Sequence, residues 1–265
     1  MSFDTERVSP AHDKRSAGQS DRNSRFRWFR GLNPTRIVRT LWRFRLGRAL
    51  VIGASGGIGR ALAHELQRRG QDVTSLSRSV DDFDITDERC IREAAGRLTG
   101  PFETIIVASG ALAIGPHGPE KTIRALDPVA VASQFALNAT GPALVLKHVL
   151  QHMPRDRRAV FAALSARVGS IGDNFLGGWY SYRASKAALN QLIHTASIEV
   201  ARSHKHAICV VLHPGTVATN LSQNYVSPAG VTADQAALNL LAVIEKLSPS
   251  QTGTFLDWAG KEVAW

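Results

Sequence analysis

Residues 49–66 read Ala-Leu-Val-Ile-Gly-Ala-Ser-Gly-Gly-Ile-Gly-Arg-Ala-Leu-Ala-His-Glu-Leu, and this stretch decides the fold. A short apolar run is followed by a glycine-rich turn and then by a segment whose apolar residues have helical spacing. The glycines permit a close approach of phosphate to the backbone, and the helix that follows presents free N–H groups to it. The stretch therefore predicts a dinucleotide site with contacts from Gly53, Ser55, Gly57, Ile58 and Gly59.

The same alternation of strand and helix continues to the end of the chain. Apolar runs of strand length occupy 49–53, 72–77, 103–108, 158–164, 206–212 and 253–257, and helical segments occupy 58–69, 87–98, 128–151, 181–203 and 233–247. Strands that alternate with helices form a parallel sheet covered on both faces, with right-handed crossovers. We therefore expect one α/β domain over residues 48–265, with a Rossmann-like, doubly wound sheet of about seven strands.

Charge divides the chain in two. Residues 1–48 hold 12 Lys and Arg against 4 Asp and Glu, whereas residues 49–265 hold 20 against 18. The net charge of +10 therefore belongs mostly to an N-terminal extension, residues 1–47, and the domain behind it is close to neutral.

This extension has no assigned chemistry. Residues 1–23 are polar without apolar periodicity, which is typical of disorder. Residues 24–47 interleave arginines with aromatic and aliphatic residues. Three interpretations remain open: a partly helical segment that lies on an anionic membrane surface, a contact with nucleic acid or a protein partner, or a segment with no role. Nucleic acid is the less favoured partner.

The remaining composition is that of an ordinary globular protein, with 44% apolar and 20% charged residues. The two cysteines, Cys90 and Cys209, lie far apart in sequence and show no metal-ligand spacing. We find no apolar stretch that reads as a membrane span. A cytoplasmic location without a disulfide framework and without a bound metal is expected.

Tyr182 and Lys186 stand four residues apart at the start of a predicted helix, so both side chains lie on one face. A phenol has a pKa of about 10 and exchanges protons poorly at neutral pH. A neighbouring ammonium stabilises the phenolate, so we expect it to lower the pKa of Tyr182. The pair predicts proton transfer to or from a reacting oxygen.

The end of the second strand should indicate which dinucleotide binds. An acidic residue there would accept hydrogen bonds from the adenosine ribose and favour NAD. This chain has Leu76-Ser77-Arg78-Ser79 instead, and Arg78 can pair with a 2′-phosphate, with Arg60 as a second candidate. NADP(H) is therefore favoured over NAD(H). Asp84, in Phe83-Asp84-Ile85, lies where a further strand is expected to end. Its side chain either accepts from the adenine amino group or caps the helix that begins near residue 87.

These motifs together resemble a known family. Those in the order and spacing of the short-chain dehydrogenase/reductases are Gly53-xxx-Gly57-x-Gly59, Asn138, Ser165, Tyr182-xxx-Lys186 and Pro214-Gly215. The resemblance runs from about Arg48 to Trp265. Within the family, residues 164–174 and 177–182 and the ending 260–265 are similar to the C-factor (C-signal) subgroup.

The resemblance implies a catalytic set of Asn138, Ser165, Tyr182 and Lys186. Ser165 should hydrogen-bond the substrate carbonyl or hydroxyl, and Tyr182 should donate or accept the proton. Lys186 should hold the nicotinamide ribose and lower the tyrosine pKa. Asn138 should anchor a water that links Lys186 to solvent.

The resemblance also implies further cofactor contacts at Gly110, Pro214, Gly215, Val217 and Thr219, together with Tyr182 and Lys186 themselves. One stretch departs from the family, which usually carries Asn-Ala-Gly after its fourth strand, whereas this chain has Ala108-Ser109-Gly110. The missing asparagine side chain is expected to weaken local rigidity more than catalysis.

Two functions from different classes follow. The first is an NADP(H)-dependent oxidoreductase that interconverts a small-molecule carbonyl and alcohol, with Tyr182 as general acid and base. The alternative is a C-factor-like signalling or regulatory protein that binds a dinucleotide without relevant turnover. For either, the resemblance implies a homodimer or homotetramer through the helices at 128–151 and 181–203.

Overall fold

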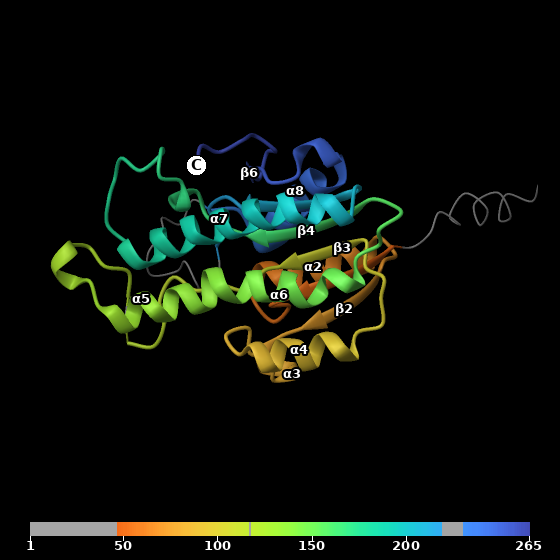
Figure 1. Ribbon diagram of the computed structural model, residues 1–265. Coiled ribbons are helices and arrows are strands. Elements are labelled where there is room, and N and C mark those ends of the chain that lie inside the picture. Colours follow the sequence, from red (N-terminus) through yellow and green to blue (C-terminus); the bar gives the residue numbers. More distant parts are fainter. Residues whose placement is uncertain (1–46, 117, 219–229) are drawn as a thin grey trace, which may run out of the picture. The chain divides into compact units, whose positions relative to one another are not determined.

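Six parallel strands form the central sheet of the residues that this computed structural model describes, which are 47–116, 118–218 and 230–265 (Figure 1). The strands are β1 (Arg48–Ile52), β2 (Asp72–Leu76), β3 (Thr104–Val107), β4 (Ala159–Leu164), β5 (Ala207–His213) and β6 (Phe255–Asp257). They lie in the order β2-β1-β3-β4-β5-β6. From β1 the chain first adds β2 on one side and then adds β3 to β6 on the other, so the strand order reverses between β1 and β3. In open α/β sheets, ligands bind at such a reversal, beyond the carboxyl ends of the strands.

The expected count of about seven strands is too high by one for the described residues. Phe83 and Ile85, where a third strand was expected to end, are buried in the core but do not pair with the sheet. A crossover between parallel strands needs a dozen or more residues. Only residues 77–82 separate β2 from Phe83, and they form the one-turn helix α3 (Arg78–Asp81). The segment therefore packs beside the carboxyl end of the sheet without adding a strand.

Helices cover both faces, as the alternating pattern predicted. The helices with α labels are α2 (Gly57–Arg68), α4 (Glu88–Arg97), α5 (Pro128–Phe135), α6 (Gly141–Val149), α7 (Tyr180–Ser203) and α8 (Ala233–Lys246), in addition to α3. The short helices are the 3₁₀-helices η1 (Ile123–Ala125), η3 (Leu150–His152), η4 (Arg167–Gly169) and η5 (Pro249–Gln251) and the π-helix η2 (Ala136–Thr140).

Strand residues alternate between two cores. Leu50, Phe161 and Val211 pack with residues of α4, α6 and α7, whereas Val51 and Val160 on the opposite side of the same strands pack with α2 and α8. This alternation follows from the two-residue period of a strand. Both faces of the sheet are dry, which is the usual condition of a parallel sheet.

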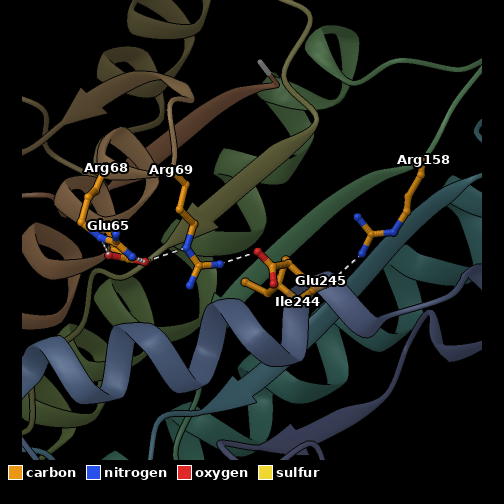
Figure 2. Close-up of polar contacts among 6 residues, drawn as sticks. All are labelled: Glu65, Arg68, Arg69, Arg158, Ile244 and Glu245. Carbon is orange, nitrogen blue, oxygen red and sulfur yellow. Dashed lines mark hydrogen bonds and ion pairs between the residues drawn. The ribbon is translucent and has the colours of Figure 1, made fainter. Parts of the chain in front are cut away.

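An ionic network joins α2 to α8 on one of these faces (Figure 2). Glu65 accepts from Arg68 at 2.6 Å and from Arg69 at 2.7 Å, and these hydrogen bonds lower the pKa of its carboxyl to about 2. Arg69 also pairs with Glu245 on α8. Because its partners belong to different helices, Arg69 links α2 to α8 at the surface, above the apolar core that the two helices share.

Arg158, which precedes β4, reaches the end of α8 in the same view (Figure 2). Its guanidinium donates to the carbonyls of Ile244 and, at 3.1 Å, Leu247. A cation at a helix carboxyl end satisfies free carbonyls and interacts favourably with the helix dipole. The contact ties the start of β4 to the helix that covers it.

The run from α5 through α6 is one long helical segment (Figure 1). Among the described residues, Pro128–His152 is long and apolar enough to cross a membrane by length and composition, which corrects the expectation that no such segment exists. Its parts pack against α4 and α7 within the domain. A helix that covers a parallel sheet is also long and apolar. Because this segment packs against α4 and α7, it is a helix of the domain core.

Several expectations lie outside the described residues. These are the basic extension over residues 1–46, its membrane or nucleic-acid contacts, and Thr219 in the segment 219–229. They stay predictions. Liposome and DNA binding by the full chain and by a chain lacking residues 1–47 would test the role of the extension.

Candidate active site

The glycine-rich turn after β1 leaves no room for a side chain at Gly53 or Gly59. Gly53 has φ +83°, and a Cβ there would lie 2.8 Å from the backbone nitrogen of Ser109. A Cβ on Gly59, in the first turn of α2, would lie 2.1 Å from the carbonyl oxygen of Gly53. Gly57 and Ile58 begin α2, whose N-cap, Gly56, has no side chain to occupy the free N–H groups. The turn therefore presents bare backbone donors, which suits a pyrophosphate.

A cleft of about 550 Å³ opens beside this turn. It is lined by segments that follow β1, β2 and β3 and by the start of η2, so it lies at the reversal of strand order. Five of the predicted cofactor contacts line it: Gly53, Ser55, Arg78, Asp84 and Gly110. The structure thus brings together residues that are up to 57 positions apart in sequence (110 less 53).

The two charged residues of the cleft have different surroundings. Arg78 begins the one-turn helix α3 at the wall of the cleft. Asp84 Oδ1 accepts from the backbone and hydroxyl of Thr86 at 2.8 and 2.7 Å, and these bonds lower the pKa of its carboxyl. The helix-capping alternative for Asp84 is wrong, because Asp87 caps α4 by accepting from the backbone of Arg89.

Tyr182 and Lys186 lie on the first turns of α7, as their spacing predicted. Lys186 is 3% exposed, and its Nζ donates to the carbonyl of Leu164 at 2.9 Å. The same Nζ lies 5.9 Å from the centre of the Tyr182 ring. Since Leu164 precedes Ser165, this contact brings the lysine beside the end of β4.

Burial changes the pKa values of Tyr182 and Lys186, and for Tyr182 the change is opposite to the one that the sequence pattern predicted. It raises the pKa of the Tyr182 phenol to about 12 and lowers the pKa of the Lys186 ammonium to about 8. The pKa of Tyr182 is therefore raised overall, not lowered as its spacing from Lys186 predicted. The physical reason is desolvation, which disfavours the charged form of each group.

Asn138 lies in the π-helix η2 and is fully buried. Its Oδ1 accepts from the backbone N–H of Ala111 at 2.9 Å, and its Nδ2 donates to the carbonyl of the same residue at 2.9 Å. A Cβ placed on Gly110 would lie 3.0 Å from Asn138 Oδ1 and 3.3 Å from Lys186 Nζ. Gly110 therefore links the floor of the cleft to the predicted catalytic residues.

Gln134, one turn before Asn138, was missed at the sequence level. Its Nε2 donates to the carbonyl of Leu112 at 2.9 Å, and its Oε1 accepts from Asn138. Two amides four residues apart on one helix thus hold the loop after β3. These bonds hold the loop that carries Ala108 in place of the family's asparagine, whose loss was expected to loosen it.

Glu120 is a second residue without a sequence signal. It is 7% exposed, and its carboxylate accepts from the backbone and hydroxyl of Ser181, while its carbonyl accepts from Trp179 N–H at 2.5 Å. Trp179, the N-cap of α7, makes no side-chain cap. Glu120 therefore supplies the cap from outside the helix and holds the turn that carries Tyr182.

The segment after β5 contains the remaining predicted contacts. Pro214 and Gly215 follow the strand directly, and Gly215 has φ +83°. Val217 forms an isolated parallel bridge with Val231. None of these residues lines the cleft described above.

Lys186 yields a testable relation between pH and stability. Its folded-state pKa of about 8 lies below its ordinary 10.5. Between these values the unfolded chain keeps a proton that the native protein has released, so stability rises with pH. We expect the unfolding free energy of wild type, relative to Lys186→Met, to rise by about 1 kcal/mol per pH unit above pH 8.

Urea unfolding of both proteins between about pH 7.5 and pH 9.5 measures this difference. Lys261→Met, which replaces an exposed lysine, is the control for the loss of a lysine side chain. A Lys186→Met difference that stays constant over this range would contradict a depressed lysine pKa.

Comparison with known proteins agrees with this geometry. Residues 80–229, more than half of the chain, match the family model described as short chain dehydrogenase. The C-signal protein of Myxococcus xanthus is 32% identical over 172 residues, which cover 65% of this chain and 98% of that protein. A 1-hydroxy-2-glutathionyl-2-methyl-3-butene dehydrogenase from Rhodococcus is 28% identical over 236 residues, covering 83% of this chain and all of the relative (100%).

A solved structure is similar as well. A short-chain dehydrogenase/reductase from Burkholderia multivorans, crystallised with bound NADP, superimposes with a TM-score of 0.68 at 26% identity and covers 83% of this chain and 100% of its own. The matched residues, the relatives and the shared fold lead to one conclusion. The chain belongs to the short-chain dehydrogenase/reductase family, within which it resembles the C-signal protein, and it is an oxidoreductase of that family.

Proposed function

We propose that this protein interconverts a carbonyl and an alcohol with NADP(H), and that Tyr182 is the general acid and base. The observation that carries the proposal is the convergence at Gly110. Lys186 Nζ and Asn138 Oδ1 both lie near the position of a Cβ on this residue, which also lines the floor of the dinucleotide cleft. The lysine of the Tyr182–Lys186 pair thus adjoins the cleft that we assign to the nucleotide.

The nicotinamide group, when bound, supplies or accepts the hydride. The chain has then to orient the reacting carbon and to move one proton. In reduction, Tyr182 donates its phenolic proton to the carbonyl oxygen. With a pKa of about 12 the phenol holds that proton at neutral pH. In oxidation the phenolate oxygen of Tyr182 accepts the proton of the alcohol. A cation near that oxygen assists, because it stabilises the phenolate.

Three other residues complete the proposed set. Lys186, whose Nζ already donates to the carbonyl of Leu164, supplies positive charge beside Tyr182 and holds the ribose of the cofactor. Ser165, at the end of β4, orients the reacting oxygen. Asn138 anchors the loop after β3 and a water that leads from Lys186 to solvent.

A broad panel of aldehydes and ketones, assayed by the loss of NADPH absorbance, tests this proposal. Oxidation of NADPH that requires an added carbonyl compound and yields the alcohol supports it. Binding of NADPH with no turnover of any compound in the panel would favour the alternative, a C-signal-like protein that binds a dinucleotide without relevant chemistry. The complete catalytic set argues against that alternative, because a binding module has no need of Tyr182.

We further propose that the protein prefers NADP(H) to NAD(H). Arg78 lines the cleft at the end of β2, and Ser77 and Ser79 flank it in place of an acid. A guanidinium forms charge-assisted, often bidentate hydrogen bonds with phosphate. Hydrogen bonds to charged groups contribute about 1.5–3 kcal/mol each, or roughly 10- to 100-fold in affinity.

Arg78→Ala is therefore expected to raise the KM for NADPH by about 10- to 100-fold and to change the KM for NADH little. Arg92→Ala on α4 is the matched control, since Arg92 is exposed and does not line the cleft, and Arg60→Ala tests the second candidate. Steady-state kinetics with both cofactors measure the effect. An equal loss for NADH and NADPH would count against a 2′-phosphate contact.

The assembly and location also belong to the proposal. Val129 on α5 and Leu192 and Ile198 on α7 are large apolar side chains exposed at 65%, 40% and 54%. They support a homodimer or homotetramer through these helices, and light scattering on the full chain measures the mass. A small-molecule substrate and a cytoplasmic location complete the proposed setting.

A further inference from the structure

A third residue continues the line of Tyr182 and Lys186 along α7. Asn190 stands four residues after Lys186 and eight after Tyr182, so the three side chains lie on one stripe of the helix. Asn190 is 2% exposed and Ser165 is 4% exposed. We propose that Asn190 is a positioning residue that fixes the Ser165 hydroxyl for the reaction, an inference that rests on the proposed function.

The contact between the two side chains is short and directional. Ser165 Oγ donates to Asn190 Oδ1 at 2.6 Å, and Asn190 Nδ2 donates to the carbonyl of Gly169 at 3.4 Å. The Gly169 carbonyl decides which amide atom faces the serine. A flipped amide would place Oδ1 against that carbonyl, and two acceptors would then face each other without a proton.

The turn that carries Ser165 cannot easily move away from Asn190. Ser165 N–H donates to the carbonyl of Leu212 at 2.8 Å, which holds the residue to β5. Gly169 is pressed against α7, since a Cβ there would lie 2.7 Å from Lys186 Cβ and 2.9 Å from its carbonyl carbon. Both ends of the turn over residues 165–169 are thus fixed, and the Asn190 amide lies between them.

The hydrogen bond fixes the position of the Ser165 hydroxyl oxygen. A serine hydroxyl has one proton and two lone pairs, and its proton can turn about the Cβ–Oγ bond. A different side-chain rotamer would leave the buried amide oxygen of Asn190 without its donor, which is unfavourable. Asn190 therefore holds Ser165 in one rotamer, so the hydroxyl oxygen is in place when its proton turns to a substrate carbonyl.

A double-mutant cycle separates this role from a general structural one. The proteins are wild type, Ser165→Ala, Asn190→Leu and the double variant, assayed for kcat and KM with NADPH and the best carbonyl compound. We expect Asn190→Leu to lower kcat about 10-fold or more, with KM changed less. In the Ser165→Ala background the same substitution should change kcat less than about twofold.

Gln191→Leu is the matched control, because it makes the same change on the next, exposed residue of α7 and should leave kcat unchanged. If Asn190→Leu does not fold, Asn190→Ser, which is too short to reach Ser165, enters the same cycle. Equal losses in both backgrounds would overturn the positioning role and leave the proposed function intact. A Ser165→Ala variant with wild-type turnover would instead overturn the proposed role of Ser165, and the inference with it.

Discussion

Replacing Tyr182 with phenylalanine is expected to lower kcat by about 10²- to 10⁴-fold, which is the usual contribution of a positioned proton-transfer group. The substitution removes one oxygen and its proton, and the ring keeps its place near Lys186 and its edge contact with Trp179. Because Tyr182 does not line the cleft of about 550 Å³ and phenylalanine keeps the ring, NADPH affinity should fall far less than kcat.

Tyr180→Phe is the control for this experiment. Tyr180 begins α7 two residues earlier, has no lysine four residues after it, and lines a separate cavity of about 420 Å³. Loss of the Tyr180 hydroxyl should change kcat little. Steady-state rates measure turnover, and fluorescence titration of NADPH measures binding. Turnover in Tyr182→Phe close to that of wild type would remove Tyr182 from the mechanism.

Replacing Gly59 with alanine should have an effect of similar size, but on cofactor binding. The added Cβ would lie 2.1 Å from the carbonyl oxygen of Gly53 and 2.8 Å from its carbonyl carbon. Both are backbone atoms, so the turn between β1 and α2 has to open. Because the same turn supplies the backbone donors of the phosphate site, we expect NADPH affinity to fall by at least about 10²-fold, or nearly 3 kcal/mol.

Gly96→Ala on α4 is the control. Its Cβ would meet nothing within 4 Å, and Gly96 does not line the cleft. Titration with NADPH and urea unfolding of both variants separate lost binding from lost stability. Equal affinities of Gly59→Ala and Gly96→Ala would contradict a turn that depends on close backbone approach.

Sequence patterns predicted the parts of this protein whose chemistry is local. The turn at 53–59 requires glycine because of backbone geometry alone, and the Tyr182–Lys186 pair requires only the period of a helix. The order of strands and helices followed from apolar spacing in the same way. Asn190 could have been found by the same reasoning, since it extends the spacing of that pair by one more turn.

Burial and long-range contacts were less accessible to sequence reasoning. The pKa of Tyr182 rises because of desolvation, whereas spacing alone suggested that Lys186 would lower it. Glu120 reaches Ser181 across 61 residues of chain, and Gln134 supports a loop 22 residues before it. No local pattern encodes such pairs, because they form only when distant segments pack together.

The sequence by itself determined the fold class, the family, the glycine-rich turn after β1 and the helix face that carries Tyr182 and Lys186. Only the tertiary structure decided that 83–85 adds no seventh strand, that Asp87 rather than Asp84 caps α4, and which side chain accepts from the Ser165 hydroxyl. The physical reason is the range of the interactions. Dihedral preferences and helix periodicity act over a few residues, whereas hydrogen-bond partners and desolvation depend on the packing of segments far apart in the chain.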